Sequence, residues 1–413
     1  MVAWYREVTA DQRRAFLAAY FAWVLDGFDF YILTFLLVDI QRAFSVTNAL
    51  AGALGTVTLI FRVVGGIGAG AAADRWGRKR PLMFSILWYS TLAFLSGFST
   101  SYGMLFGLRA LFGIGMGGVW AAGVPLTIEH WPARLRGTAS GLLQGGYSVG
   151  IILSALVYQV AYPIVSRHGD LAWRAMLWIG VLPALLVVWI MRRVPESPIW
   201  LERHEMLRDR REHEPLPLTR LFAPQLRTTV LQTSLLMGAF LFSNQSITFW
   251  YARFLASVHK EPLPFLLALN AGGIAGAALW GRISEGRLGR RGALTLAMSI
   301  GVAATPLYLF AATGLGLWIG ALIVGVFAAG CLGIMPGYLS ERFPTEARGV
   351  GAGFAYHVGA GLGSFTPYMV GAFQDRGVPL TTTMATCIVL SGVLVIVFVW
   401  LGPETRGRTL RSA

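Results

Sequence analysis

Two carboxylates occur within a segment that is otherwise apolar. Asp26 and Asp29 lie in FAWVLDGFDFYILTFLLV, residues 21–38, in which every other residue could face lipid. Residues three apart lie on one side of a helix, so both acids would share a face. A charge near the centre of a bilayer is expensive, and acids found there typically serve proton transfer or pair with an ion.

Two arginines accompany the acids in other apolar segments. Arg62 lies in FRVVGGIGAG and Arg109 in RALFGIGMGG. At a rise of about 1.5 Å per residue, Asp26 and Arg62 lie about 16 and 18 Å from the cytoplasmic ends of their helices. Asp29 and Arg109 lie farther out, at about 21 and 30 Å. Such a cluster at mid to outer depth indicates a transport pathway.

A permanent ion-pair clamp between helices is the structural alternative for these charges. Buried ion pairs are poor stabilisers, however. The chain also holds 50 glycines, which allow close helix packing without charges. A titratable carboxylate beside an arginine can instead exchange a proton when the arginine is drawn to an anion.

The composition indicates that the whole chain is a polytopic membrane protein. Of its 413 residues, 55% are hydrophobic and only 13% are charged, and the mean hydropathy is +0.60. Long uncharged runs recur along the full length, which is typical of membrane-spanning helices. The sequence therefore predicts an all-α fold with twelve spans, near residues 15–38, 50–73, 81–100, 103–128, 137–163, 173–193, 227–256, 263–283, 292–313, 316–339, 349–374 and 380–401.

The basic residues indicate topology. The pI is about 10.4, but the charge is concentrated in alternate connections, such as DRWGRKR (74–80), EHWPARLR (129–136) and SEGRLGRR (284–291). The positive-inside rule places these loops, and both termini, in the cytoplasm of a cell whose inner membrane the chain spans. The basic charge therefore does not predict nucleic-acid binding.

Targeting and metal signals are weak. The first apolar segment contains two acids, exceeds the apolar region of a signal peptide in length and lacks a small-residue cleavage site. Cys331 and Cys387 both fall inside predicted helices. The sequence thus predicts no disulfide framework, no metal site and no cofactor.

An internal repeat divides the chain into two halves. EHWPARLRGTASG at 129–141 matches ERFPTEARGVGAG at 341–353, and the same offset of 212 aligns GRK (77–79) with GRR (289–291). PESP (195–198) and PETR (403–406) repeat too, four residues out of register. We expect parallel repeats related by an axis along the membrane normal. The predicted parts are a six-helix bundle over 1–193, a cytoplasmic linker over 194–226 and a second bundle over 227–413.

These motifs carry a family resemblance over the full chain. GAAADRWGRKR (70–80) resembles the loop between helices two and three of the major facilitator superfamily, and RALFGIGMGG (109–118) resembles its fourth-helix motif. In the second half, Gly286 takes the place of Asp74, with Glu285 one residue early. This departure weakens the case for a matching gate contact there.

Within that superfamily, the chain most resembles the sialate- and lactate-type proton symporters. The resemblance rests on DGFDF, FRVVGGIGAG and EHWPARLRGTASGLLQGGYSVG, and metabolite and aromatic-acid symporters share part of it. Relatives often carry an acid where this chain has Val119, so coupling here must rely on other groups.

The resemblance also implies roles for the buried charges. By analogy with proton-coupled sugar porters, Asp29 and Arg109 form the proton-coupling pair, with Asp26 as a second candidate. Arg62 is then the countercharge of Asp26 or of a carboxylate substrate. The further substrate-binding candidates are polar groups on helices five, seven and eleven: Gln144, Tyr147, Asn244, Gln245, Tyr356 and His357. The gating candidates lie at the cytoplasmic helix ends: Asp74, Arg78, Glu129, Arg136, Glu341 and Arg348.

The sequence as a whole predicts a transporter and not an enzyme. The expected activity is proton-coupled uptake of a small organic anion by alternating access, either a monocarboxylate such as lactate or pyruvate or a sialate-like sugar acid. Alternatives are a symporter for aromatic acids or sugars, and a metabolite or drug exporter, although no proline of the exporter type occurs in SGLLQGGYSVGIILS. The expected partners are the anion, protons and the lipid bilayer, and we expect a monomer.

Overall fold

The computed structural model describes residues 7–132, 135–210, 223–344 and 348–406. Over these ranges the regular elements are α-helices and short 3₁₀ turns, without a strand. The predicted all-α fold is therefore confirmed.

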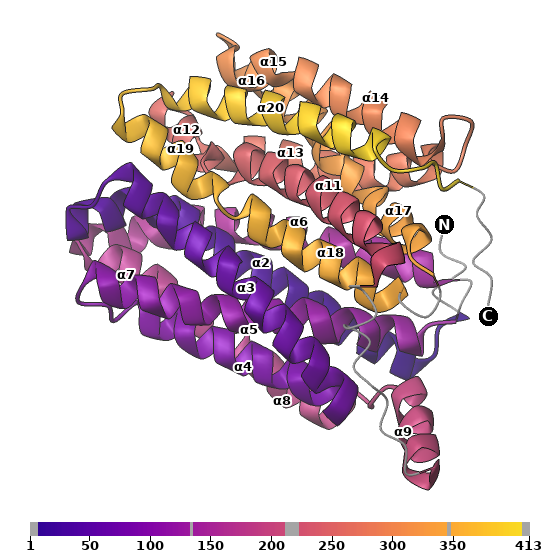
Figure 1. Cartoon of the computed structure of the whole chain (residues 1–413). Coiled ribbons are helices and arrows are strands. Elements are labelled where there is room, and N and C mark those ends of the chain that lie inside the picture. Colours follow the sequence, from indigo (N-terminus) through magenta and orange to yellow (C-terminus); the bar gives the residue numbers. More distant parts are fainter. Residues whose placement is uncertain (1–6, 133–134, 211–222, 345–347, 407–413) are drawn as a thin grey trace. The chain divides into compact units, whose positions relative to one another are not determined.

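Contacts between residues divide the chain into two compact units (Figure 1). Unit 1 comprises Met1–Val46 and Val57–Pro215, and unit 2 comprises Thr47–Thr56 and Leu216–Ala413. Helix α3 begins with unit 2 and continues with unit 1. The domain boundaries given by the sequence stay a prediction.

The first half of the chain contains the helices up to α9. In chain order they are α2 (Ala10–Phe44), α3 (Asn48–Trp76), α4 (Lys79–Ser96), α5 (Tyr102–His130), α6 (Arg136–Val165), η2 (Ser166–His168), α7 (Leu171–Trp178), η3 (Ile179–Val181), α8 (Ala184–Arg193) and α9 (Pro198–Arg210). The second half contains α11 (Pro224–Thr248), α12 (Tyr251–Ser257), α13 (Pro262–Ile283), α14 (Gly289–Ala303), α15 (Thr305–Phe310), α16 (Gly314–Phe327), η4 (Ala329–Gly333), α17 (Met335–Arg342), α18 (Arg348–Gly363), α19 (Thr366–Asp375) and α20 (Leu380–Trp400).

Each of the twelve apolar segments coincides with one helix or with a broken pair of helices. Nine helical stretches in the described ranges are long and apolar enough to cross a membrane, by length and composition. Three of the nine consist of consecutive pieces, namely α7–α8, α14–α15 and α16–α17. The other three predicted spans, 81–100, 227–256 and 349–374, correspond to the 18-residue α4 and to the pairs α11–α12 and α18–α19. Proline contributes to the breaks, because it lacks an N–H and clashes with the preceding turn; Pro306 and Pro367 begin the second pieces α15 and α19.

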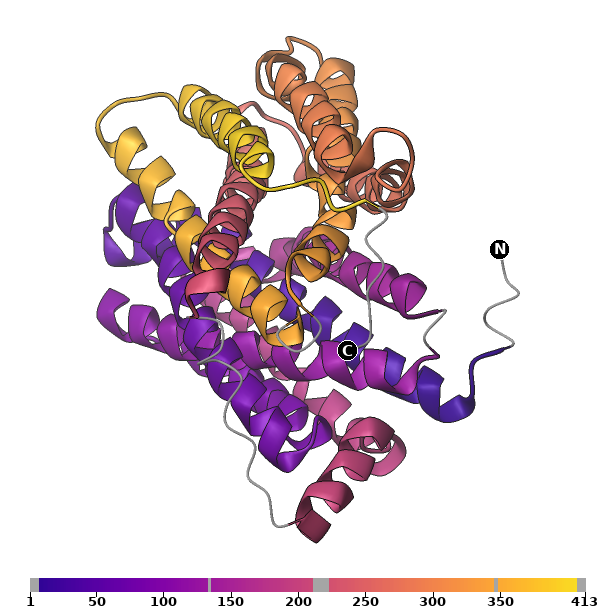
Figure 2. The same ribbon diagram turned by 45° about the vertical axis from the view of Figure 1, so that its right-hand side comes forward.

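Unit 1 positions the buried charges on helices that run side by side. Helix α2 packs against α5 and α6, and α4 packs against α5 (Figure 1 and Figure 2). Small residues allow α5 to approach α3 closely. A Cβ atom at Gly117 would overlap the carbonyl oxygen of Arg62, so the backbones touch where only glycine fits. This contact fixes the depth of Arg62 relative to α5.

Unit 2 is assembled in a similar way from its own helices. Helix α11 packs against α18 and α20, and α13 packs against α16. The predicted helix-buried cysteines behave as small hydrophobic groups, because Cys331 and Cys387 are both buried and unoxidised.

Candidate functional site

Asp26 and Arg62 form an ion pair inside unit 1. The Nη2 atom of Arg62 lies 3.8 Å from Oδ2 of Asp26, and their side chains are 5% and 0% exposed. Asp26 lies on α2 and Arg62 on α3. The separation exceeds hydrogen-bond distance, so the two charges attract without a short bond that would lock them. Of the two partners predicted for Arg62, which are Asp26 and a carboxylate substrate, the structure places Asp26 beside it.

Two aromatic rings flank the guanidinium of Arg62. Its Cζ atom lies 5.0 Å from the ring centroid of Trp23 and 5.9 Å from that of Tyr147. The two rings are themselves 5.0 Å apart. Cation–π contacts help to hold a guanidinium in place. Sequence reasoning singled out Tyr147 but missed Trp23, because an aromatic residue within an apolar helix carries no signal of its own.

Asp29 and Arg109, the predicted coupling pair, are both 1% exposed. Each acts as a neighbouring opposite charge on the other, but they form neither an ion pair nor a hydrogen bond in the structure, which describes both side chains. Thr58 fixes the backbone at this point, since its hydroxyl donates to the carbonyl of Arg109 at 3.1 Å. The guanidinium of Arg109 also lies 4.9 Å from the ring of Phe112.

The remaining substrate candidates are distributed over both units. Gln144 is half-buried on α6 of unit 1. In unit 2, Gln245 on α11 is buried and its side-chain oxygen accepts no hydrogen bond from the described residues, whereas Asn244 is half-buried. On α18, His357 is buried beside Tyr356, with ring centroids 5.6 Å apart.

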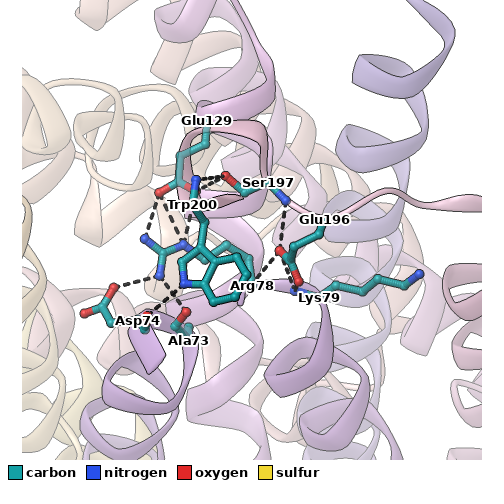
Figure 3. Close-up of polar contacts among 8 residues, drawn as sticks. All are labelled: Ala73, Asp74, Arg78, Lys79, Glu129, Glu196, Ser197 and Trp200. Carbon is teal, nitrogen blue, oxygen red and sulfur yellow. Dashed lines mark hydrogen bonds and ion pairs between the residues drawn. The ribbon is translucent and has the colours of Figure 1, made fainter. Parts of the chain in front are cut away.

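A second polar cluster lies where the loop 74–80 meets the end of α5 (Figure 3). Arg78 is its centre. Its Nη1 atom donates to Oδ1 of Asp74 and to the carbonyl of Ala73, both at 2.7 Å. Its Nη2 atom donates to Oε1 of Glu129 at 2.9 Å. Arg78 therefore contacts the two other gating candidates of this region, Asp74 and Glu129. The side chain of Arg136, a further gating candidate, lies outside the described residues.

The PESP segment completes this cluster (Figure 3). The carboxylate of Glu196 accepts the backbone N–H of Arg78 at 2.8 Å, and the hydroxyl of Ser197 donates to Glu129 at 2.5 Å. The indole of Trp200 donates to the carbonyl of Asp74 at 2.8 Å. Gly77 permits the contact, because its φ of +89° is strained for other residues and a Cβ there would meet Glu196.

Unit 2 holds an equivalent cluster around Arg290. Its Nη2 atom donates to Oε1 of Glu341 at 2.9 Å, and its Nη1 atom donates to the hydroxyl of Ser284 at 2.6 Å. Glu285 is more distant, at 4.0 Å. The departure from the motif at Gly286 does not prevent a matching contact in this half, because Ser284 supplies the oxygen that Asp74 supplies in unit 1.

The PETR segment repeats the role of PESP. The carboxylate of Glu404 accepts the backbone N–H of Arg290 at 2.9 Å, and the hydroxyl of Thr405 donates to Glu341 at 2.6 Å. Gly289 has a φ of +67°, as Gly77 has a positive φ. The side chain of Arg348, a predicted gating residue, lies outside the described residues.

Sequence reasoning did not assign a role to Glu196, Ser197, Glu404 or Thr405. The repeat of PESP and PETR was visible in the sequence, and it was the one signal that could have found them. A motif repeated in two halves near loop arginines indicates paired contacts, even where its register differs.

Comparison with known proteins agrees with this arrangement. The family model described as Major Facilitator Superfamily matches residues 19–367. The probable 4-methylmuconolactone transporter of Cupriavidus pinatubonensis is 33% identical, over 100% of this chain and 95% of that protein. The sialic acid transporter NanX of Escherichia coli is 31% identical, over 92% of each. The cis,cis-muconate transport protein of Acinetobacter baylyi is 30% identical, over 88% of each.

A solved structure gives the same fold. The xylose transporter XylE from E. coli, in a partially occluded inward open conformation, superposes with a TM-score of 0.73 over 97% of this chain and 100% of that chain, at 20% identity. The relatives confirm the predictions of a transporter and of a resemblance to organic-acid carriers. Because the family model covers most of the sequence, the chain is a multi-pass membrane protein that belongs to the Major Facilitator Superfamily.

Proposed function

We propose that the protein is a proton-coupled symporter that takes up a small organic anion by alternating access. The observation that carries the proposal is the buried ion pair of Asp26 and Arg62, with Arg62 beside the rings of Trp23 and Tyr147. A substrate carboxylate can compete with Asp26 for the guanidinium. A planar carboxylate binds a guanidinium through two parallel hydrogen bonds, which is a stronger contact than an ion pair at 3.8 Å.

The proton is carried by a carboxylate of the same cluster. Asp29 is the first candidate and Asp26 the second, because both are buried acids whose charge would be costly without a partner. Arg109 tunes Asp29 as a neighbouring positive charge. An acid that gains a proton when its arginine is diverted links proton binding to anion binding, which a permanent ion pair cannot do.

Two substrate classes fit the rings around Arg62. Relatives are named for sialic acid, a sugar acid, and for 4-methylmuconolactone and muconate, which are unsaturated carboxylates. A flat unsaturated acid can stack on Trp23 and Tyr147 and so bury most of its own apolar surface. The two rings therefore favour unsaturated carboxylates over sugar acids. Gln144, Asn244, Gln245, Tyr356 and His357 are proposed to add hydrogen bonds to the substrate.

The proposed setting is the inner membrane of a bacterial cell, with both termini cytoplasmic and the protein acting as a monomer. The clusters around Arg78 and Arg290 then lie on the cytoplasmic side and act as gate contacts. The positive-inside distribution of arginines supports this orientation.

Counterflow in proteoliposomes tests the activity. Liposomes loaded with lactate, pyruvate, sialate, benzoate, cis,cis-muconate or xylose would be assayed for exchange with the same labelled compound. We expect exchange of one or more of the acids. We also expect that an inwardly directed proton gradient drives net accumulation of the same acid. Exchange of xylose alone, or accumulation of an acid that ignores the pH gradient, contradicts the proposal.

A further inference from the structure

The interior of unit 1 contains a group of buried polar atoms around Asp29 that the ion pair of Asp26 does not use. The group comprises the carboxylate of Asp29, the guanidinium of Arg109 and the hydroxyls of Tyr89 and Ser90. All four side chains are 0–1% exposed. None of these polar atoms has a hydrogen-bond partner among the residues that the structure describes. They come from three helices, α2, α4 and α5.

These groups are neighbours in space. Tyr89 and Ser90 are consecutive on α4, and Ala93, one helical turn after Tyr89, lies beside Asp29, because a Cβ atom at Gly180 would meet both of them. The ring of Tyr89 packs on Phe112 at 5.9 Å, and Phe112 in turn contacts Arg109. The charged or titratable groups that act on Asp29 are Arg109 from α5, Asp26 from its own helix and Tyr89 from α4.

Besides α2, α4 and α5, the 3₁₀ turn η3 also lies next to Asp29. A Cβ atom at Gly180 would lie 3.0 Å from Oδ1 of Asp29 and 2.7 Å from Cβ of Ala93. Glycine therefore leaves the carboxylate unobstructed on this side. The turn brings no charge to Asp29 at this point.

A buried polar group without a partner costs about 1–3 kcal/mol, and native proteins satisfy such groups with protein atoms or ordered water. Water is retained in an interior where two or more polar groups can bind it. Here two carboxylate oxygens, three guanidinium nitrogens and two hydroxyls are buried without a hydrogen-bond partner among the described residues. This set can both donate to and accept from water.

We propose that this group is a hydrated proton relay, in which the hydroxyls of Tyr89 and Ser90 conduct the proton to and from Asp29. The relay rests on the proposed proton-coupled function and adds two residues to it. In the inward step, the Tyr89 hydroxyl gives its proton to a bridging water, and that water passes one of its own protons to the Asp29 carboxylate. At the same moment the Tyr89 hydroxyl takes a proton from a second water, which is hydrogen-bonded to Ser90 and is resupplied by hydronium. One O–H bond breaks as another forms, so Tyr89 stays neutral.

Matched hydroxyl deletions test the relay. Tyr89→Phe and Ser90→Ala remove hydroxyls without partners. Two controls remove hydroxyls that bond the backbone: Ser96→Ala, on the same helix, whose hydroxyl donates to Leu92 at 2.7 Å, and Tyr308→Phe, whose hydroxyl donates to Ile247 at 2.8 Å. Uptake driven by a pH gradient and counterflow are measured in the same liposomes, across a range of pH.

We expect Tyr89→Phe to slow gradient-driven uptake by about tenfold, a barrier increase of about 1.4 kcal/mol, while counterflow stays within about twofold. Ser90→Ala is expected to act in the same direction, and both controls to match the wild type. Wild-type uptake by both relay variants overturns the proposal. If Tyr89→Phe also loses counterflow, Ser90→Ala decides: normal gradient-driven uptake by that variant overturns the relay.

The infrared band of the protonated Asp29 carboxyl gives a readout that does not depend on transport. The band is identified as the one missing from Asp29→Asn, and the relay requires that Tyr89→Phe shift it, because the water that hydrogen-bonds that carboxyl loses its contact with the Tyr89 hydroxyl. Asp29→Asn that still concentrates substrate contradicts the proposed proton site itself. Loss of accumulation in Asp29→Asn with normal behaviour of both relay variants contradicts the relay alone.

Discussion

The carboxylate of Asp375 caps the first turn of α3 at Asn48. One oxygen accepts the backbone N–H of Asn48 at 2.9 Å and its side-chain amide at 2.8 Å, and the other accepts the N–H of Ala49 at 2.7 Å. Asp375 lies just beyond the predicted span 349–374. Burial would raise the pKa of Asp375, but the hydrogen bonds from Ala49 and Asn48 outweigh it and lower the pKa. The charged form is therefore the one that binds the helix end.

Asp375→Ala should loosen the start of α3. Loss of a capping side chain typically costs about 1 kcal/mol, so hydrogen exchange at Asn48 and Ala49 should accelerate about fivefold at pH 7. Because the pKa of Asp375 is lowered, the cap is complete above the ordinary aspartate pKa and is lost as the pH falls through the lowered value. The difference between variant and wild type should shrink accordingly in acid.

Asp170→Ala is the matched control for this cap. Asp170 occupies the N-cap position of α7, yet its side chain makes no capping hydrogen bond. Exchange in the first turn of α7 should be unchanged in that variant. Equal exchange rates at Asn48 in Asp375→Ala and the wild type would show that the contact contributes nothing.

Asp29→Asn is expected to abolish proton-driven accumulation and to preserve exchange. Asparagine resembles the permanently protonated acid, and exchange requires no net release of a proton. Uptake under a pH gradient and counterflow in the same liposomes separate the two activities. If Asp29→Asn still concentrates substrate, the coupling site lies elsewhere, and the same pair of measurements on Asp26→Asn follows.

Asp74→Asn should slow transport while changing substrate affinity only a few fold. Asp74 contacts Arg78 at 2.7 Å at a helix end, far in sequence from the buried acids, so its removal biases the conformational equilibrium and leaves the binding groups intact. Glu285→Gln is the matched control, because Glu285 is 71% exposed and lies 4.0 Å from Arg290. Lost equilibrium binding with normal turnover would refute this assignment of Asp74.

Charge within apolar segments was the most informative part of the sequence. Asp26, Asp29, Arg62 and Arg109 stood out because ionised groups are rare in spanning helices, and the structure buries all four in unit 1. The breaks within the helices were harder to predict from the sequence. Residues 173–193 read as one continuous span, but the structure interrupts it at η3, next to Pro183.

The contacts of the loop motifs could not be predicted for a different reason. Ser197 lies 68 residues from Glu129 in the chain, and charged or hydroxyl groups are common in loops. No local pattern selects which of them meet. Trp23 was missed as well, since its contact with Arg62 depends on how α2 packs against its neighbours.

Glu404→Gln should lower thermal stability at neutral pH. The carboxylate accepts backbone N–H groups of Arg290, Arg291, Thr405 and Arg406, and a neutral amide accepts them more weakly. Burial would raise the pKa of Glu404, but the backbone hydrogen bonds from Arg291 and Arg406 outweigh it and lower the pKa. The contribution is therefore present above the ordinary glutamate pKa and disappears as the pH falls through the lowered value.

Melting curves in detergent between pH 7 and acid conditions check this expectation. The gap in Tm between wild type and Glu404→Gln should be largest at pH 7 and close in acid. Glu261→Gln serves as control, because Glu261 precedes α13 without a side-chain capping bond. A gap that stays constant with pH would mean that the charge of Glu404 is irrelevant.

Cysteines introduced at positions 205 and 408 should react only with reagents that enter the cell. The arginine distribution places both positions in the cytoplasm. The native Cys331 and Cys387 are buried and give a low background. Labelling of either position by an impermeant reagent in intact cells would reverse the proposed topology.

The spacing of equivalent residues in the two arginine clusters bears on how the two halves of the chain diverged. Arginine and glutamate are 51 residues apart in each half, from Arg78 to Glu129 and from Arg290 to Glu341. The hydroxyl that donates to the glutamate is 68 residues from it in the first half and 64 in the second, a difference of four. Four residues make about one α-helical turn, so a helix that gains or loses them keeps its faces in phase. After duplication, the halves could therefore differ in length by whole turns while each kept the contact inherited from a single ancestral copy.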